Sequence, residues 1–119
     1  MSDEVRRTAT RTYKVLPNTP VRLAIVIGDS QQGGTSLTWA GAVTTEAEPV
    51  DRAIGGAGED LRGKVLTCTT TVKDTNKMTN HTSVTYRLTG GAADQEFPFD
   101  IDVSQDGGYA VYLVSFVFI

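Results

Sequence analysis

The sequence predicts an all-β protein, a single-domain antiparallel β-sandwich with little or no helix. Three observations predict it. Threonine occurs 17 times in the 119 residues, mostly in runs that it shares with valine, isoleucine, tyrosine and phenylalanine, which fit a pleated sheet. No stretch of eleven or more residues keeps apolar residues at helical spacing. Short strands divided by glycine and proline turns are typical of a sandwich or barrel.

About seven strands are predicted, in an Ig-like or jelly-roll-like arrangement. They cover residues 8–15, 21–27, 36–44, 64–72, 82–88, 96–103 and 109–119. In the run 96–103, apolar residues alternate with Glu96, Pro98, Asp100 and Asp102. Because proline has no amide proton to donate, Pro98 places this strand at a sheet edge or faces outward from the ladder.

The alternating runs also predict which strands pair and which side chains are buried. We expect residues 64–72 to pair antiparallel with residues 82–88 across a solvated turn at 74–81. The acidic stretch 45–63 is the one long connection, functional or mobile, with room for a helical turn near residues 59–62. The predicted core residues are Leu23, Ile25, Leu66, Val84, Tyr86, Phe97, Phe99, Ile101, Val114 and Phe116.

The net charge and the lengths of the apolar segments argue against some classes of partner. The net charge is −3, without a basic block, which argues against nucleic-acid binding because that needs a positive footprint. The start of the chain lacks the apolar segment of a secretory signal. The longest apolar run, 109–119, is too short to span a bilayer as a helix. We therefore expect a cytoplasmic protein without a membrane partner.

No motif for catalysis or metal binding stands out, so the chain is predicted to be no enzyme and to hold no cofactor. The single Cys68 is expected to be a buried apolar residue, distant from the single His81. Asp100 and Asp102 are interpreted as a solvated strand face. The loop that begins at Asp74 starts like a calcium site but lacks its glycine and its closing glutamate. Calcium held between several loops stays open, as does the role of the acidic stretch 45–63.

Alternate connections of an antiparallel sandwich share one end, and this predicts a candidate binding site. The connections near residues 28–34, 74–81 and 104–108 should meet there. Polar loop side chains on a rigid scaffold suit a polar ligand such as a glycan, stacked on Trp39 or a tyrosine. The candidate ligand-binding residues are Asp29, Gln31, Gln32, Asn76, Asn80, His81 and Asp106.

The last strand is apolar on both faces, which is unusual for a strand exposed on one side. Its second row, the candidate interface, consists of Val111, Leu113, Val117 and Ile119. Either the long connection 45–63 or another subunit covers this row. The first function hypothesis is therefore a non-enzymatic binding or assembly module, a homo-oligomer or the binder of a protein partner. The alternative is a small carbohydrate-binding, lectin-like domain.

Overall fold

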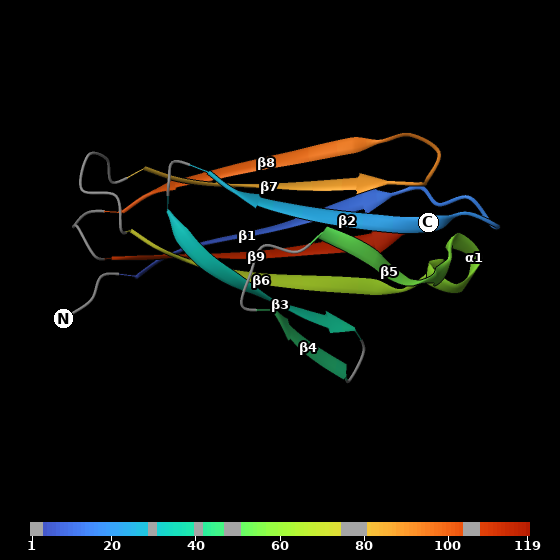
Figure 1. Ribbon diagram of the computed structural model, residues 1–119, viewed down its shortest axis with the longest axis horizontal. Coiled ribbons are helices and arrows are strands. Elements are labelled where there is room, and N and C mark those ends of the chain that lie inside the picture. Colours follow the sequence, from blue (N-terminus) through green and yellow to red (C-terminus); the bar gives the residue numbers. More distant parts are fainter. Residues whose placement is uncertain (1–3, 29–30, 40–41, 47–50, 75–80, 104–107) are drawn as a thin grey trace.

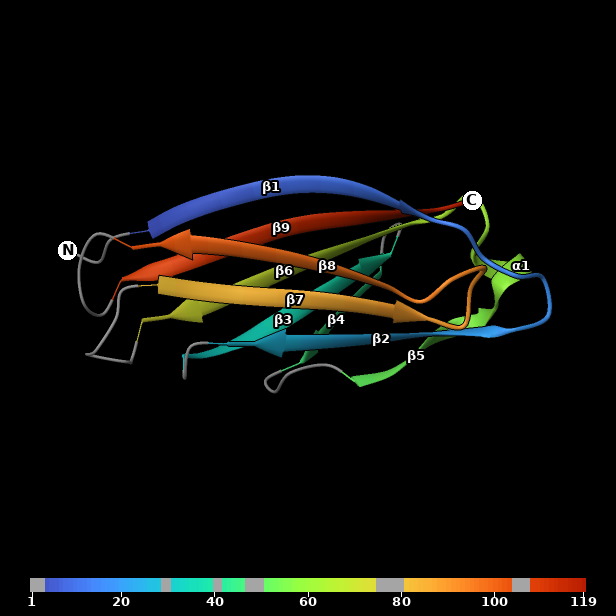
Figure 2. The same ribbon diagram turned by 90° about the horizontal axis from the view of Figure 1, so that it is seen from above.

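The protein is a β-sandwich, as the sequence predicts (Figures 1 and 2). The computed structural model describes residues 4–28, 31–39, 42–46, 51–74, 81–103 and 108–119. Within them, sheet A has five strands in the order β1-β9-β6-β3-β4, and sheet B has four in the order β5-β2-β7-β8. The elements are β1 (Glu4–Tyr13), β2 (Pro20–Ile27), β3 (Gln32–Trp39), β4 (Ala42–Glu46), β5 (Asp51–Ala57), α1 (Gly58–Leu61), β6 (Val65–Lys73), β7 (His81–Thr89), β8 (Gln95–Asp102) and β9 (Tyr109–Phe118).

The described residues thus form nine strands where the sequence predicts about seven. The predicted strand 36–44 is two strands, β3 and β4, which pair antiparallel with Trp39 opposite Ala42. The predicted connection 45–63 contains β5, which the sequence pattern hides because glycines weaken the strand signal. The helical turn expected near residues 59–62 is confirmed as α1, and its Leu61 is buried.

The expected hairpin between residues 64–72 and 82–88 is wrong. β6 pairs with β3 and β9 in sheet A, whereas β7 pairs with β2 and β8 in sheet B. Both strands have one fully buried row, and these rows face each other across the core, where the hydroxyls of Thr70 and Tyr86 lie 2.7 Å apart. Alternation alone does not distinguish two strands that pair from two that stack.

The first and last strands pair in parallel, so the sandwich is not wholly antiparallel. Glu4 lies opposite Tyr109, and the register runs without a shift to Tyr13 and Phe118. β9 therefore lies between β1 and β6 and is an inner strand of sheet A. Figure 2 shows β1 and β9 running side by side along the molecule.

One hydrophobic cluster fills the space between the sheets. Nine of the ten predicted core residues are at most 7% exposed, and Phe97 is partly buried against Phe116. Pro98 lies in β8, an edge strand of sheet B, as the sequence predicts. The guanidinium groups of Arg7 and Arg11 each lie 5.3 Å from the centre of the Phe99 ring and link β1 to β8.

Among the described residues, no helix has the length and apolar character needed to cross a membrane.

Candidate functional site

Three connections converge at one end of the sandwich, as the sequence predicts. The Gln31 side chain is 7% exposed and donates from Nε2 to Asp74 Oδ1 at 2.9 Å and to the carbonyl oxygen of His81 at 3.1 Å. The backbone amide of Asp74 donates to the carbonyl oxygen of Gly108 at 2.9 Å. These bonds tie β2–β3, β6–β7 and β8–β9 together at one point.

The candidate ligand residues have different positions around this end. The side chain of Gln31 makes the hydrogen bonds to Asp74 and His81 that join these connections. Gln32 is the first residue of β3. His81 is the first residue of β7 and lies at the surface. The remaining candidates lie outside the described residues: Asp29, Asn76, Asn80 and Asp106. Ligand binding by the seven stays a prediction. Of the two candidates whose side chains the structure describes, Gln31 is buried and His81 lies at the surface.

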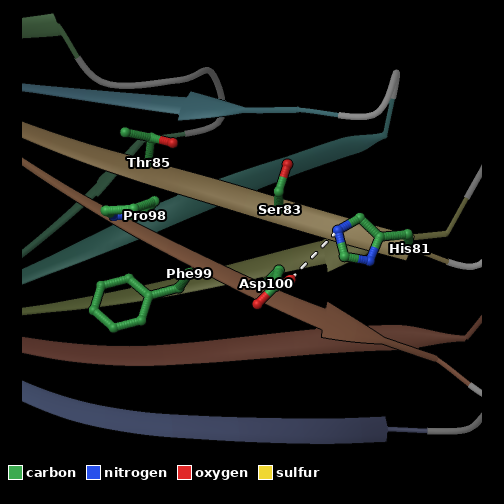
Figure 3. Close-up of a pocket in the computed structure, with 6 residues that line it drawn as sticks. All are labelled: His81, Ser83, Thr85, Pro98, Phe99 and Asp100. Atoms are coloured by element: carbon green, nitrogen blue, oxygen red, sulfur yellow. Dashed lines mark ion pairs between the residues drawn. The ribbon is translucent and has the colours of Figure 1, made fainter.

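His81 lies against two carboxylates of the neighbouring strand. Its Nδ1 is 2.5 Å from Asp102 Oδ1. Its Nε2 is 3.6 Å from Asp100 Oδ2, and this ion pair is the dashed line in Figure 3. A carboxylate accepts hydrogen bonds, so Nδ1 carries the proton. The exposed fractions of the three side chains are 38% for His81, 64% for Asp100 and 78% for Asp102. The cluster therefore lies at the surface, on the outer face of sheet B.

An open depression of about 380 Å³ lies beside this cluster. Its walls come from β7 and β8, and the residues that line it are His81, Ser83, Thr85, Pro98, Phe99 and Asp100. Figure 3 shows the Ser83 hydroxyl pointing away from the imidazole, toward Gly28, where a Cβ would come within 2.3 Å of Ser83 Oγ. Ser83 and His81 therefore do not form a nucleophile and base pair.

The sequence contains the signal for the His81 cluster. The alternation in β8 points Asp100 and Asp102 to one side, and the glycines at 90 and 91 indicate a turn between residues 82–88 and 96–103. Pairing these two runs places His81 opposite Asp102, as observed. A pairing of residues 64–72 with 82–88 does not bring these residues together, whereas the observed pairing of β7 with β8 does.

Among the described residues, few groups are placed to bind a metal ion or to react as a thiol. In the part of the chain that the structure describes, no three or more His, Cys, Asp or Glu residues are arranged to hold a metal ion. Asp74, the first residue of the calcium-like loop, is 4% exposed and bonded to Gln31. Cys68 is buried as expected, and burial raises the pKa of its thiol to about 12.

The outer face of sheet A is the second candidate surface. Its central positions lie in register on four adjacent strands. They are Thr8, Thr10 and Thr12 of β1, Leu113, Ser115 and Val117 of β9, Val65, Thr67 and Thr69 of β6, and Ser36 and Thr38 of β3. We call these eleven residues the neutral face, because none is charged. Charged residues follow at both ends, Arg6 and Lys73 at one and the exposed Lys14 at the other. The hydroxyls of Thr67 and Ser115 lie 3.1 Å apart.

The candidate interface row lies along the centre of this face. Val111 is 8% exposed, Leu113 and Val117 are half-buried, and Ile119 is 52% exposed at the chain end. The described part of residues 45–63 does not cover the row: it places β4 at the far edge of sheet A, β5 in sheet B and Leu61 of α1 in the core.

The fold and these two surfaces define the chain as a β-sandwich with one neutral and one polar face. No family model, curated protein or solved structure matches the chain. The geometry of the two surfaces is therefore the basis for a functional proposal.

Proposed function

We propose that the protein is a non-enzymatic assembly module that associates with copies of itself through the neutral face. The supporting observation is the run of eleven uncharged positions across four strands, in a chain of which 21% of residues are charged. Interface centres are depleted in charge. A surface without charge also meets an identical copy without like-charge repulsion, as a two-fold contact requires.

The dimensions of sheet A suit such a contact. Five strands about 4.8 Å apart, with up to ten residues at about 3.3 Å each, cover roughly 700 Å². Each partner in a standard interface contributes about 800 Å². The whole outer face of sheet A, centred on the neutral face, is therefore close to the area that a specific dimer needs.

The side chains of the neutral face also suit sheet-on-sheet packing. Two sheets pack about 10 Å apart with their side chains interdigitated. Leu113, Val117 and Val65 supply apolar contact, and the threonine methyl groups extend it. The hydroxyls of Thr67 and Ser115 are already neighbours within the face, so this pair keeps a partner when water is excluded.

Two substitutions in the middle of the face test the proposal. Leu113→Asp or Val117→Asp places a charge on each side of the contact and removes apolar burial worth about 1.5–3 kcal/mol per copy. The dissociation constant should rise by about 10² to 10⁴. Sedimentation or light scattering measures the association, and circular dichroism confirms that each variant is folded.

Val26→Asp is the matched control. Val26 is 54% exposed on the outer face of sheet B, so the same kind of change should leave association unchanged. A wild-type chain that stays monomeric at millimolar concentration contradicts the proposal. Equal association of Val26→Asp and Leu113→Asp contradicts it as well.

The depression on sheet B favours a second candidate function, glycan binding. An imidazole, two hydroxyls and a carboxylate around a 380 Å³ hollow are groups that bond sugar hydroxyls, and the volume falls in the range of small-ligand sites. Trp39 is no stacking platform here, because its ring packs on Phe118 with centroids 5.8 Å apart. Asp100→Asn should abolish binding on a glycan array, and Glu96→Gln on the same strand should not. Absence of any array signal removes this candidate.

A further inference from the structure

Arg7 and Arg11 of β1 hold their guanidinium groups over one aromatic ring. Both lie on the row of β1 that is in register with the buried Tyr112 and Phe116 of β9. Each guanidinium carbon is 5.3 Å from the centre of the Phe99 ring, so the two carbons are at most twice that distance apart. The fold therefore brings two positive charges to one place.

The two arginines lie at the side of the sandwich, between the edges of the two sheets. Within the described residues, β1 is an edge strand of sheet A and β8 is an edge strand of sheet B, and the two strands contact each other. Figure 3 shows the Phe99 ring pointing from β8 toward the side on which β1 lies. The ring is 4% exposed whereas both arginines are exposed, so the guanidinium groups cover the ring and face the solvent.

Most of the hydrogen-bond donors of these arginines have no partner among the described residues. A guanidinium carries five N–H donors in its plane, and a contact over a ring uses the face of the group rather than its edge. The one hydrogen bond of either group within the described residues runs from Arg11 Nη1 to the carbonyl oxygen of Thr10 at 2.9 Å. No described carboxylate forms an ion pair with Arg7 or Arg11. The remaining donors can therefore bond a ligand that comes from the solvent.

The carboxylates of β8 do not neutralise this pair of charges. Glu96 is bonded to an arginine of β7, and Asp100 and Asp102 lie against His81. All three alternate with Phe99 along the strand and belong to its other face. Two like charges that are held around one ring repel each other, and an anion bonded to both would relieve that repulsion.

We propose that Arg7 and Arg11 bind a doubly charged oxoanion, a phosphate or sulfate group, and that Phe99 is the positioning residue that holds both guanidinium groups. Each guanidinium can donate two parallel N–H bonds to such a group. A tetrahedral oxoanion presents oxygens in several directions and can bond both arginines at once. Because the ring already orders the two side chains, binding loses less of their conformational freedom. The site needs neither the neutral face nor the depression on sheet B, so it goes beyond both proposed functions.

Titration with inorganic phosphate tests the site when it is followed by the NMR signals of the arginine Nε groups. The signals of Arg7 and Arg11 should shift together and saturate with one dissociation constant, and inorganic sulfate should shift the same two signals. Acetate at the same ionic strength should bind about tenfold more weakly, because it has one charge and two oxygens. Shifts confined to other arginines, or equal affinities for acetate and phosphate, overturn the proposal.

Methyl phosphate distinguishes the two sources of such an anion. Because both arginines face the solvent, the ester should bind as tightly as inorganic phosphate, which supports a site for a phosphate or sulfate group on a larger molecule. Binding of the inorganic ions alone supports a site for the free anion.

Four variants separate a built site from diffuse attraction. Arg7→Gln or Arg11→Gln should weaken phosphate binding about tenfold to a hundredfold, as the loss of a charge-assisted contact does. Phe99→Leu keeps the net charge but removes the ring, and it should weaken binding about tenfold because the arginines are no longer positioned. Arg62→Gln removes the same charge from an exposed arginine that follows α1 and should bind phosphate like wild type.

Circular dichroism shows whether each variant is folded. If Phe99→Leu does not fold, Arg7→Lys gives an equivalent test, because lysine keeps the charge but lacks the planar group that lies on the ring, and it should weaken binding as well. Equal affinities of Arg7→Gln and Arg62→Gln overturn the site. A folded Phe99→Leu chain or an Arg7→Lys chain that binds phosphate like wild type overturns the positioning by the ring.

Discussion

Tyr112 of β9 reaches across the sandwich to Thr82 of β7, and their hydroxyl oxygens lie 2.6 Å apart. Thr82 Oγ1 donates to the carbonyl oxygen of Ile101 at 2.7 Å, so the tyrosine hydroxyl is the donor to Thr82. Tyr86 makes the reverse crossing, from sheet B to Thr70 in sheet A. Burial raises the pKa of both tyrosines, which keeps them protonated. Each sheet therefore contributes one buried tyrosine hydroxyl that bonds to a threonine of the other sheet.

Thr82→Val should therefore destabilise the fold by about 1–3 kcal/mol. Valine keeps the shape of threonine but removes the hydroxyl that bonds to both the Tyr112 hydroxyl and the Ile101 carbonyl, and the loss of buried hydrogen-bond partners costs about that much. Denaturant unfolding measures the loss. Thr85→Val, on the same strand but facing outward, should change stability by less than about 0.5 kcal/mol.

The double variant separates the hydrogen bond from general packing. With Tyr112→Phe already present, Thr82→Val should cost less than it does alone, because one unsatisfied group has been removed. Additive losses in the two single variants would mean that the hydroxyls act independently.

The sequence predicts the strands and their buried rows better than it predicts their neighbours. The row Leu66, Cys68 and Val72 and the row Val84, Tyr86 and Leu88 are both fully buried, as their alternation indicates. The alternation does not reveal that these rows face each other from different sheets. Strand neighbours depend on contacts distant in sequence, so the alternation alone predicts the wrong partner for β6 and β7.

The two candidate surfaces differ in how far the sequence predicts them. The apolar outer row of β9, with Leu113 and Val117, is evident from its alternation. The threonines of β1 are evident only as a solvated strand, because their place beside β9 depends on the parallel pairing of the chain's two ends. The neutral face as a whole appears only when four strands from distant parts of the chain are set in order.

Cys68 should not react with thiol reagents while the protein is folded. Its thiol is 0% exposed, and its pKa of about 12 leaves almost no thiolate at pH 8. Because that pKa is raised, an increase in pH to 10 should not produce labelling either. Reaction with a chromogenic disulfide should follow unfolding in denaturant and be complete there. Rapid labelling of the native chain would contradict the burial of this residue.

Two glycines with positive φ angles should differ in their tolerance of a side chain. Gly63, at φ +85°, has open space around the position of a Cβ, whereas a Cβ at Gly90, at φ +91°, would come within 2.1 Å of the Pro20 carbonyl oxygen. Gly63→Ala should cost about 1–2 kcal/mol from backbone conformation alone. Gly90→Ala should cost clearly more, and thermal unfolding compares the pair. Equal losses would mean that the turn at Gly90 relaxes freely.

Phe99→Ala should destabilise the protein by about 3–5 kcal/mol, as large-to-small changes in a core do. Phe99 is 4% exposed although it lies in an edge strand, because Arg7 and Arg11 of β1 cover its ring. A loss below 1 kcal/mol would mean that the ring contributes little to the core.

Substitutions of Arg7 and Arg11 test whether these side chains act through the Phe99 ring. Arg7→Ala or Arg11→Ala should cost about 0.5–1 kcal/mol, the strength of a cation–π contact at an exposed site. In the Phe99→Ala background the same changes should cost nothing, because the ring they cover is gone. Arg62→Ala, an exposed arginine that follows α1, serves as the control for charge alone. If Arg7→Ala is as costly without the ring as with it, the arginine stabilises β1 by some contact other than Phe99.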